Sequence, residues 1–102
     1  MAVLNVTIDN FDSVKASEKV VLIDFYADWC GPCRMVSPIV DAIAEEHPEY
    51  LVCKVNVDEQ GELAQAFGVM SIPTLAVMKD GKVVSKQAGA MPKSSILEML
   101  NI

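Results

Sequence analysis

The sequence is short of the residues on which most metal sites and disulfide scaffolds depend. It contains three cysteines and one histidine. An odd number of cysteines argues against the disulfide framework of a secreted domain. Structural zinc needs four ligands and an iron–sulfur cluster generally needs four thiolates, whereas Cys53 and His47 stand at no recognisable spacing from the other two cysteines. We therefore expect no bound metal.

Basic residues and long apolar runs are also scarce. Eight lysines and arginines accompany fourteen aspartates and glutamates, for a net charge of −6, and without a basic cluster we expect no nucleic-acid partner. The apolar run from Val20 to Ala27 is interrupted by Asp24 and is far shorter than the ~20 residues that a membrane-spanning helix needs. The first six residues lack the basic region and long apolar stretch of a targeting segment. We expect a cytoplasmic protein with no membrane partner.

Hydrophobic residues, in contrast, are plentiful. They make up 52% of the 102 residues, which is enough to build a core without disulfide staples. This length corresponds to one domain, and the sequence shows no internal repeat, linker or low-complexity segment. We therefore predict a single domain over residues 1–102.

Hydrophobic patterning predicts five strands and four helices. Runs of β-branched and aromatic residues predict strands at 3–6, 20–27, 51–57, 74–79 and 82–87. Apolar residues at helical spacing predict a helix carrying Phe11 and Val14, one from the cysteine pair to about His47, one around Leu63 and Phe67, and one from Pro92 that buries Ile96, Leu97 and Leu100. Alternating strands and helices pair in parallel, and the two consecutive strands add an antiparallel edge, so we predict an α/β fold with a mixed sheet.

Local signals mark several boundaries of these elements. Asp9 or Asn10 can cap the first helix, and Pro48 ends the second, because the residue before a proline avoids helical geometry. Pro38 removes one hydrogen bond from that helix and should kink its axis. Gly68 suits the position after a helix, and Asp80-Gly81 is a strong two-residue hairpin signal.

Two cysteines three residues apart, Cys30 and Cys33, lie where the second strand gives way to the long helix. Free backbone N–H groups and the helix dipole favour a thiolate at Cys30, and a thiolate is the reactive form. Residues i and i+3 of a helix lie within reach of a disulfide, and Pro32 suits the first helical turn. A c-type haem site would need histidine where Arg34 stands, and a purely structural bridge would constrain little of the unfolded chain. The pair therefore favours redox chemistry.

Two charged residues lie within predicted strands. Asp24 has apolar neighbours on both sides, and a buried carboxyl has a raised pKa unless nearby donors satisfy it. Either a proton-transfer role or a carboxyl satisfied by backbone donors fits this position. Lys54 is the only charged residue of its strand, and it either reaches solvent from a strand end or faces another charge.

Trp29 and Cys53 are the remaining candidates that the residues themselves suggest. Trp29 precedes the reactive pair, where it shields the site or contacts partners rather than filling the core. Cys53 is read as a small buried hydrophobe.

The segment Trp29-Cys30-Gly31-Pro32-Cys33 resembles the active-site motif of the thioredoxin family. The similarity continues through Asp24-Phe25-Tyr26-Ala27, Lys54, Ile72-Pro73-Thr74 and Gly89, in order and over essentially the whole chain. The resemblance implies the thioredoxin fold, in which a central mixed sheet of five strands is flanked by four helices. Arg34 stands where the family often has lysine, which keeps the positive charge.

The resemblance also implies roles for individual residues. Cys30 attacks a target disulfide, and Cys33 then resolves the mixed disulfide with help from Asp24, which exchanges a proton with it. Lys54 lies near Asp24 and tunes its proton balance. Gly31-Pro32 places no cation between the cysteines, which favours a reductant over an oxidant or isomerase.

Partner binding is implied for a further set of residues around the pair. In the family a cis proline lies beside the disulfide, and the backbone before it pairs with an extended substrate segment. The residues at matching positions are Trp29, Met70, Ser71, Ile72, Pro73, Gly89 and Ala90.

We predict a general protein-disulfide reductase that acts as a monomer and binds no cofactor beyond its own redox-active disulfide. By resemblance, its partners are disulfide-containing target proteins and a thioredoxin reductase, a flavoprotein that uses NADPH. One alternative is an oxidant or isomerase on the same fold. The other is a binding or assembly subunit whose redox activity is not essential.

Overall fold

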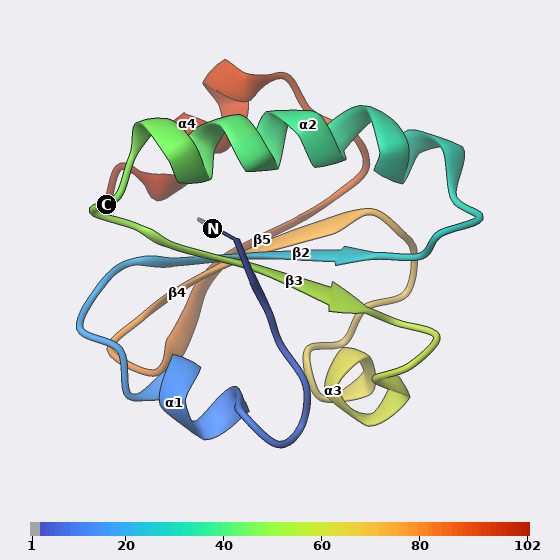
Figure 1. The fold of residues 1–102 in the computed structure, drawn as a ribbon, viewed down its shortest axis with the longest axis horizontal. Coiled ribbons are helices and arrows are strands. Elements are labelled where there is room, and N and C mark those ends of the chain that lie inside the picture. The colour runs from blue at the N-terminus through green and yellow to red at the C-terminus, as the bar shows by residue number, and fades with distance from the viewer. Residues whose placement is uncertain (1–2) are drawn as a thin grey trace.

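The computed structural model of the chain describes residues 3–102 and shows a five-stranded sheet (Figure 1). Met1 and Ala2, with which the expected domain begins, lie outside the described residues. The strands stand in the order β1-β3-β2-β4-β5. Their bounds are β1 (Val3–Asn5), β2 (Val21–Tyr26), β3 (Leu51–Asn56), β4 (Thr74–Lys79) and β5 (Lys82–Ala88).

The sheet is mixed, as predicted. β3 runs parallel to both β1 and β2, whereas β4 is antiparallel to β2 and β5 is antiparallel to β4. Parallel strands end at the same edge of a sheet, so the segments that follow β2 and β3 lie at one edge. β2 is the central strand, with a neighbour on each side.

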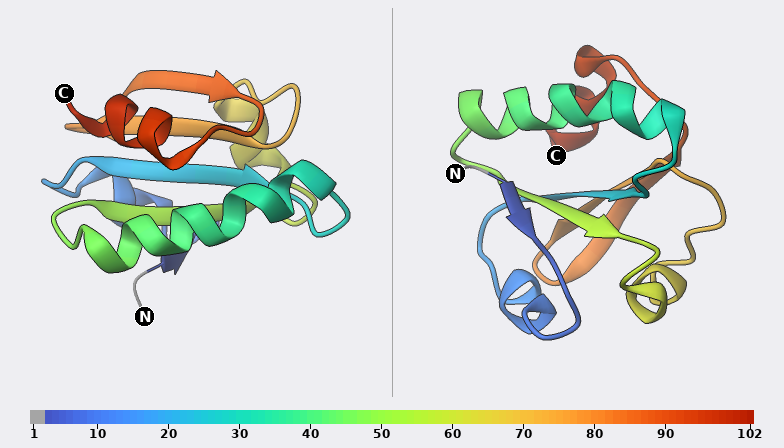
Figure 2. Two further views of the ribbon diagram at one scale, coloured as in Figure 1. Left: turned by 90° about the horizontal axis from the view of Figure 1, so that it is seen from above. Right: turned by 45° about the vertical axis from the view of Figure 1, so that its right-hand side comes forward.

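Four helices cover the two faces of the sheet. α2 (Gly31–Glu46) and α4 (Lys93–Leu100) lie on one face, and α1 (Phe11–Lys15) and α3 (Gly61–Ala66) lie on the other (Figures 1 and 2). The predicted arrangement of five strands and four helices is therefore confirmed. No helix within residues 3–102 is long and apolar enough to cross a membrane.

The core is divided by the sheet, because side chains alternate between its faces. Ile23 and Phe25 of β2 pack toward α1 and α3, where Phe25 meets Phe67 with ring centroids 5.0 Å apart. Leu22 of β2 packs toward α2 and α4. A strand that is buried on both faces reads as a continuous apolar run, which is why this one could be predicted. Of the three α4 residues expected to be buried, only Leu97 remains partly exposed.

Two turns have the backbone conformation that their residues favour. Asp80 and Gly81 have φ values of 54° and 79°, and they join β4 to β5 as a two-residue hairpin. Gly68, with φ of 67°, follows the residue that caps α3. Both predictions are confirmed. The hairpin also contains a register shift between Val77 and Met78, which the sequence did not indicate.

Other local predictions hold in part. Asn10 occupies the position before α1, but its side chain does not cap the helix; it accepts a hydrogen bond from the Thr7 N–H and donates one to the Asn5 carbonyl. α2 continues through Pro38 and ends before Pro48, as expected. The kink at Pro38 stays a prediction.

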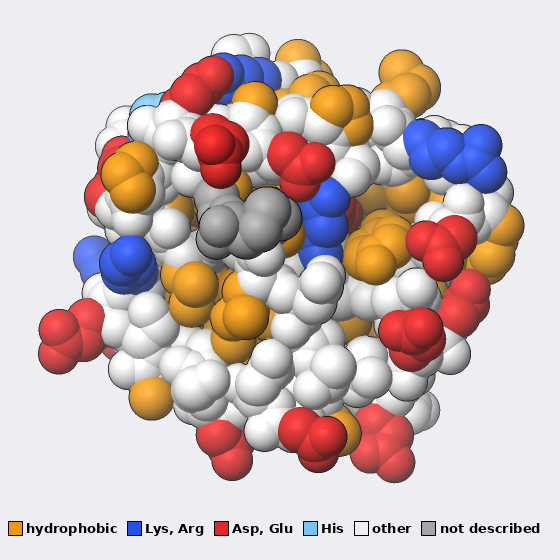
Figure 3. Space-filling view, viewed as in Figure 1, with side chains coloured by type: hydrophobic (Ala, Val, Ile, Leu, Met, Phe, Trp, Pro, Cys, Tyr) orange, Lys and Arg blue, Asp and Glu red, His pale blue; other side chains and the backbone are white. Residues whose placement is uncertain are grey.

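Acidic and basic side chains are mixed over the face of the molecule seen in Figure 3. Acidic side chains are scattered across this face, and the basic ones lie apart from one another. This dispersion agrees with the absence of a basic cluster in the sequence.

Candidate active site

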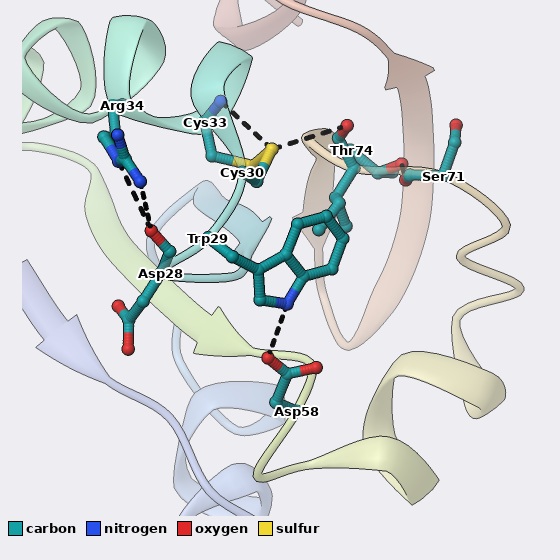
Figure 4. Close-up of a disulfide and its surroundings, with 9 residues drawn as sticks. Asp28, Trp29, Cys30, Cys33, Arg34, Asp58, Ser71 and Thr74 are labelled. Carbon is teal, nitrogen blue, oxygen red and sulfur yellow. Dashed lines mark hydrogen bonds between the residues drawn. A yellow bond between two sulfur atoms is a disulfide. The ribbon is translucent and has the colours of Figure 1, made fainter.

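The cysteine pair lies where β2 leads into α2 (Figure 4). Cys30 caps the amino terminus of α2, and Cys33 lies in its first turn. The two residues form a disulfide with their Cα atoms 5.3 Å apart. The position predicted for each cysteine is thus confirmed.

The end of the helix surrounds the Cys30 sulfur with backbone groups. The Cys33 N–H donates a hydrogen bond to Cys30 Sγ over 3.2 Å. On the other side, the carbonyl oxygen of Ile72 lies 3.8 Å from the same sulfur. An N–H donor at the positive end of a helix dipole stabilises negative charge, so this geometry favours a thiolate at Cys30 once the disulfide opens.

The two cysteines are almost equally buried, with 4% and 3% of their surfaces exposed, but they line different cavities. Cys30 lines an open groove of about 500 Å³. Cys33 lines a smaller cavity of about 240 Å³, together with Tyr26, Ala27, Asp28, Arg34 and Ser37. The larger of the two cavities is therefore the one that Cys30 borders.

The groove beside Cys30 is largely apolar. Trp29 is 67% exposed, so it lies at the surface rather than in the core, and its Nε1–H donates to Asp58 Oδ2 over 2.9 Å. Met70 also lines the groove and is 95% exposed. The full lining is Trp29, Cys30, Gly31, Pro32, Val57, Ala64, Val69, Met70, Ser71 and Ile72. Four of the seven predicted partner residues thus line this groove.

Pro73 and Gly89 lie together beside the groove. The Ile72–Pro73 bond is cis, in agreement with the resemblance, and Pro73 is buried. The Gly89 N–H donates to the Pro73 carbonyl over 2.7 Å, from a backbone with φ of 98° that favours glycine. Ala90 does not line the groove. It borders a separate apolar pocket that also contains Met35.

Asp24 is completely buried on β2, and neither of its carboxyl oxygens accepts a hydrogen bond from a described residue. The interpretation of a carboxyl satisfied by backbone donors is therefore wrong. Burial raises the pKa of Asp24 to about 7; the positive charge of Lys54 opposes the rise, and the negative charge of Asp41 adds to it. Such a carboxyl can take up or release a proton near neutral pH.

Lys54 stands directly across from Asp24 in the register of β2 and β3. Its ammonium group nevertheless pairs with α2, where it donates to Ser37 Oγ over 2.5 Å and lies 3.0 Å from Asp41 Oδ1. Lys54 therefore lies beside Asp24 in the sheet, as predicted, but its ammonium group forms its ion pair with Asp41. The sequence analysis did not predict this contact of Lys54 with Ser37 and Asp41.

Two further polar contacts support the site and were not predicted. Arg34 donates through its guanidinium to the carbonyl oxygen of Asp28, over 3.3 Å from Nε and 3.1 Å from a terminal nitrogen (Figure 4). This contact ties the loop before Cys30 to the first turn of α2. The contact between Trp29 and Asp58 fixes the indole ring in the same way.

Cys53 lies in the core between the sheet and the helices α1 and α3. Its side chain is fully buried, and burial raises the pKa of its thiol to about 12. The prediction of a buried apolar cysteine is confirmed. Among the described residues, no cluster of three or more histidine, cysteine, aspartate and glutamate side chains is placed to hold a metal ion.

Comparison with known proteins agrees with this geometry. The family model described as Thioredoxin matches residues 2–102. The chain belongs to the thioredoxin family. A thioredoxin of Bacillus subtilis (strain 168) is 46% identical over 102 residues, covering 99% of this chain and 97% of the relative. A thioredoxin of Porphyra purpurea is 48% identical, with coverage of 99% and 96%. The structure of a mutant thioredoxin from Halobacterium salinarum NRC-1 superposes with a TM-score of 0.90 at 39% identity, covering 96% of this chain and 87% of that one.

Family membership and the paired cysteines together establish the activity. The chain is a protein-disulfide oxidoreductase, and it works by dithiol–disulfide exchange through Cys30 and Cys33. A thioredoxin carries electrons in this disulfide and needs no prosthetic group. Membership also implies two kinds of partner, a thioredoxin reductase and disulfide-containing targets.

Proposed function

We propose that this thioredoxin-family protein reduces target disulfides with Cys30 as nucleophile and Cys33 as resolving thiol. The observation that carries the assignment is that Cys30 lines the open groove, whereas Cys33 lines a separate, smaller cavity. A target that docks in the groove meets the sulfur of Cys30 first. The Cys33 N–H then stabilises the attacking thiolate.

The exchange balances in two steps. The Cys30 thiolate attacks one sulfur of the target disulfide; the sulfur–sulfur bond breaks, a mixed disulfide forms, and the other target sulfur leaves as a thiolate. The Cys33 thiolate next attacks Cys30 Sγ, which expels the second target thiolate and closes the disulfide between the two cysteines. The target gains two electrons, and the dithiol loses them.

Cys33 must lose its proton before the second step, and we assign Asp24 as the group that receives it. Asp24 is buried on the strand that leads into the motif, and its pKa of about 7 matches proton transfer near neutral pH. Lys54 tunes this chemistry through its charge. Gly31 and Pro32 tune it by placing no cation between the two cysteines.

Target recognition is assigned to the groove and its rim. The exposed side chains of Trp29 and Met70 offer apolar contact area. The backbone at Ser71 and Ile72 would pair with an extended segment of the target. Pro73, Gly89 and Ala90 complete the partner surface. The backbone would supply affinity for many sequences, which suits a general reductase.

The oxidised protein is regenerated, in this proposal, by a flavoprotein reductase that draws electrons from NADPH. The protein acts as a monomeric single domain over residues 1–102 and works in the cytoplasm. The family resemblance supports these assignments. An oxidant or isomerase is less well supported, because Gly31-Pro32 brings no cation to the pair. A purely structural assembly subunit would not need the unpaired buried carboxyl of Asp24.

The assignment of the two cysteines is tested by trapping a mixed disulfide. Cys33→Ser should react with a model protein disulfide and accumulate the adduct, because the second step is lost. Cys30→Ser should form almost no adduct. Mass spectrometry after a timed quench measures both variants, and insulin reduction with a matched reductase measures the wild type. Equal trapping by the two variants would show that either sulfur can attack and would overturn the assignment.

A further inference from the structure

Two carboxyl groups, of Asp24 and Asp41, and the ammonium group of Lys54 lie close together between the sheet and α2. Side chains alternate along strands, so Asp24 points to the same face as its neighbour Leu22, which packs against α2 and α4. Lys54 is the residue paired with Asp24 on β3. Asp41 lies one helical turn after Ser37 on α2, and both reach the ammonium group of Lys54.

Of the two aspartates, Asp41 forms an ion pair with Lys54 and Asp24 does not. The ammonium of Lys54 lies 3.0 Å from Asp41 Oδ1 and makes no ion pair with Asp24 among the described residues. The Lys54 side chain is only 14% exposed, whereas that of Asp41 is 56% exposed. A largely buried cation is thus anchored to a carboxylate at the surface, while a fully buried carboxyl next to it has no partner.

We propose that Asp41 and Ser37 are positioning residues for Lys54: they hold its ammonium group on α2 and off the Asp24 carboxyl, and thereby set the pH at which Asp24 exchanges its proton. The inference rests on the proposed role of Asp24 in proton transfer. Neither Asp41 nor Ser37 touches the reacting sulfurs. They act through Lys54 alone.

No other charged group on the neighbouring elements of the described structure is placed to change the proton affinity of Asp24 in the same way. On β4 the residue paired with Asp24 is Leu75, which is apolar and buried. On β2 itself, Tyr26 faces the same side two residues along; burial chiefly raises the pKa of its hydroxyl, so it carries no charge near neutral pH. On α2 the titratable residues near Asp24 are Asp41 and Cys33, and Cys33 is held in the disulfide. Lys54 is therefore the one cation whose placement can change the proton affinity of Asp24 within the described residues.

Removing Asp41 should release Lys54 toward Asp24. With Asp41→Asn, the buried ammonium loses its anion, and the nearest remaining carboxyl is Asp24. An opposite charge within about 4–6 Å lowers the pKa of an aspartate by roughly 1–3 units. The titration midpoint of Asp24 should therefore fall by at least about one pH unit. The direct loss of the Asp41 charge acts in the same direction but through solvent, because Asp41 is exposed, and so it is a small part of the change.

A double-mutant cycle separates positioning from direct repulsion. The oxidised full-length chain, labelled with ¹³C at aspartate, is titrated by NMR at the Asp24 carboxyl carbon. The variants are Asp41→Asn, Lys54→Met and the two combined, with Lys54→Gln as the second background should the methionine variant not fold. Glu45→Gln is the matched control, because Glu45 is an exposed carboxylate one turn further along α2 with no ion pair in the described structure.

Positioning predicts that Asp41→Asn lowers the Asp24 midpoint in the native background and has less than a third of that effect once Lys54 is replaced. Glu45→Gln should leave the midpoint unchanged. The proposal is overturned if Asp41→Asn leaves or raises the midpoint, if its effect is equal in both backgrounds, or if Glu45→Gln matches it.

Exchange kinetics then tell this proposal apart from the function on which it rests. The pH profile of mixed-disulfide resolution should move to lower pH in Asp41→Asn, in step with the NMR midpoint. A midpoint that moves while the profile stays fixed supports the positioning of Lys54 but refutes Asp24 as the proton acceptor. A fixed midpoint refutes the positioning, whatever the kinetics show.

Discussion

Replacing Asp24 with asparagine should flatten the pH dependence of folding stability in the oxidised protein. Asp24 is fully buried, and burial raises the pKa of its carboxyl from 3.8 to about 7. Between these values the folded protein holds a proton that the unfolded chain has released. The free energy of unfolding therefore falls as the pH rises through this window, and the stabilisation is complete only below pH 3.8.

The size of the effect follows from the two pKa values. Each unit of difference between them corresponds to about 1.4 kcal/mol, so the full cost of burying the ionised carboxyl is roughly 4 kcal/mol above pH 7. Between pH 5 and pH 8 the group should remove about 2.5 kcal/mol from the stability of the wild type. Asparagine has no charge to lose, so Asp24→Asn should lack this part of the pH dependence.

Urea unfolding followed by circular dichroism at pH 5 and pH 8 measures the difference. Comparing two pH values within each protein cancels any constant cost of the buried amide. Asp28→Asn is the control, because it removes the same charge from an exposed position before the motif. If wild type and Asp24→Asn lose the same stability between the two pH values, the carboxyl does not hold its proton in the folded state and the reasoning fails. The variant should also slow resolution of the mixed disulfide at and below neutral pH.

Two other residues give further predictions. Asp58→Ala should lower kcat/KM for a protein disulfide about fivefold, mostly through KM, because the Trp29 indole loses a hydrogen bond of about 1 kcal/mol. Asp58→Asn keeps an acceptor for the indole N–H, so its kcat/KM should stay close to that of the wild type. Equal losses of kcat/KM in both variants would argue against a role for this hydrogen bond. Cys53 should resist alkylation by iodoacetamide at pH 8 in the oxidised protein, since with a thiol pKa of about 12 only about one molecule in ten thousand carries the thiolate. The same cysteine should react readily in urea, and fast labelling of the folded protein would contradict its burial.

Much of the fold was predictable because local and long-range signals agree. β2 is apolar on both faces because it is the central strand, and Asp80-Gly81 adopts the backbone that its sequence favours. Met35 shows where periodicity falls short. It belongs to the apolar stripe of α2 by spacing, yet it is 69% exposed. The stripe records only which side of a helix is apolar, and the start of α2 lies beyond the end of β2, where the sheet no longer covers it (Figure 1).

The site was predictable for residues that are close in sequence and not for contacts across elements. Cys30 and Cys33 are separated by one helical turn, so their spacing alone places them within reach of a disulfide. The pairing of Lys54 with Asp41 depends on how α2 is rotated over β3, and no local pattern contains that angle. For the same reason, Asp58 could not be recognised as the partner of Trp29, which precedes it by 29 residues.

The central position of β2 in the sheet determines which part of the chain unfolds last. β2 is hydrogen-bonded to β3 on one side and β4 on the other, and its residues from Val21 to Phe25 are buried. Its amide protons should therefore be among the last to exchange with solvent, at rates that report global unfolding rather than local fraying. The cysteine pair follows this strand directly, so it is anchored to the most persistent part of the chain. Its sulfurs can form and break bonds while the backbone that carries them stays in place.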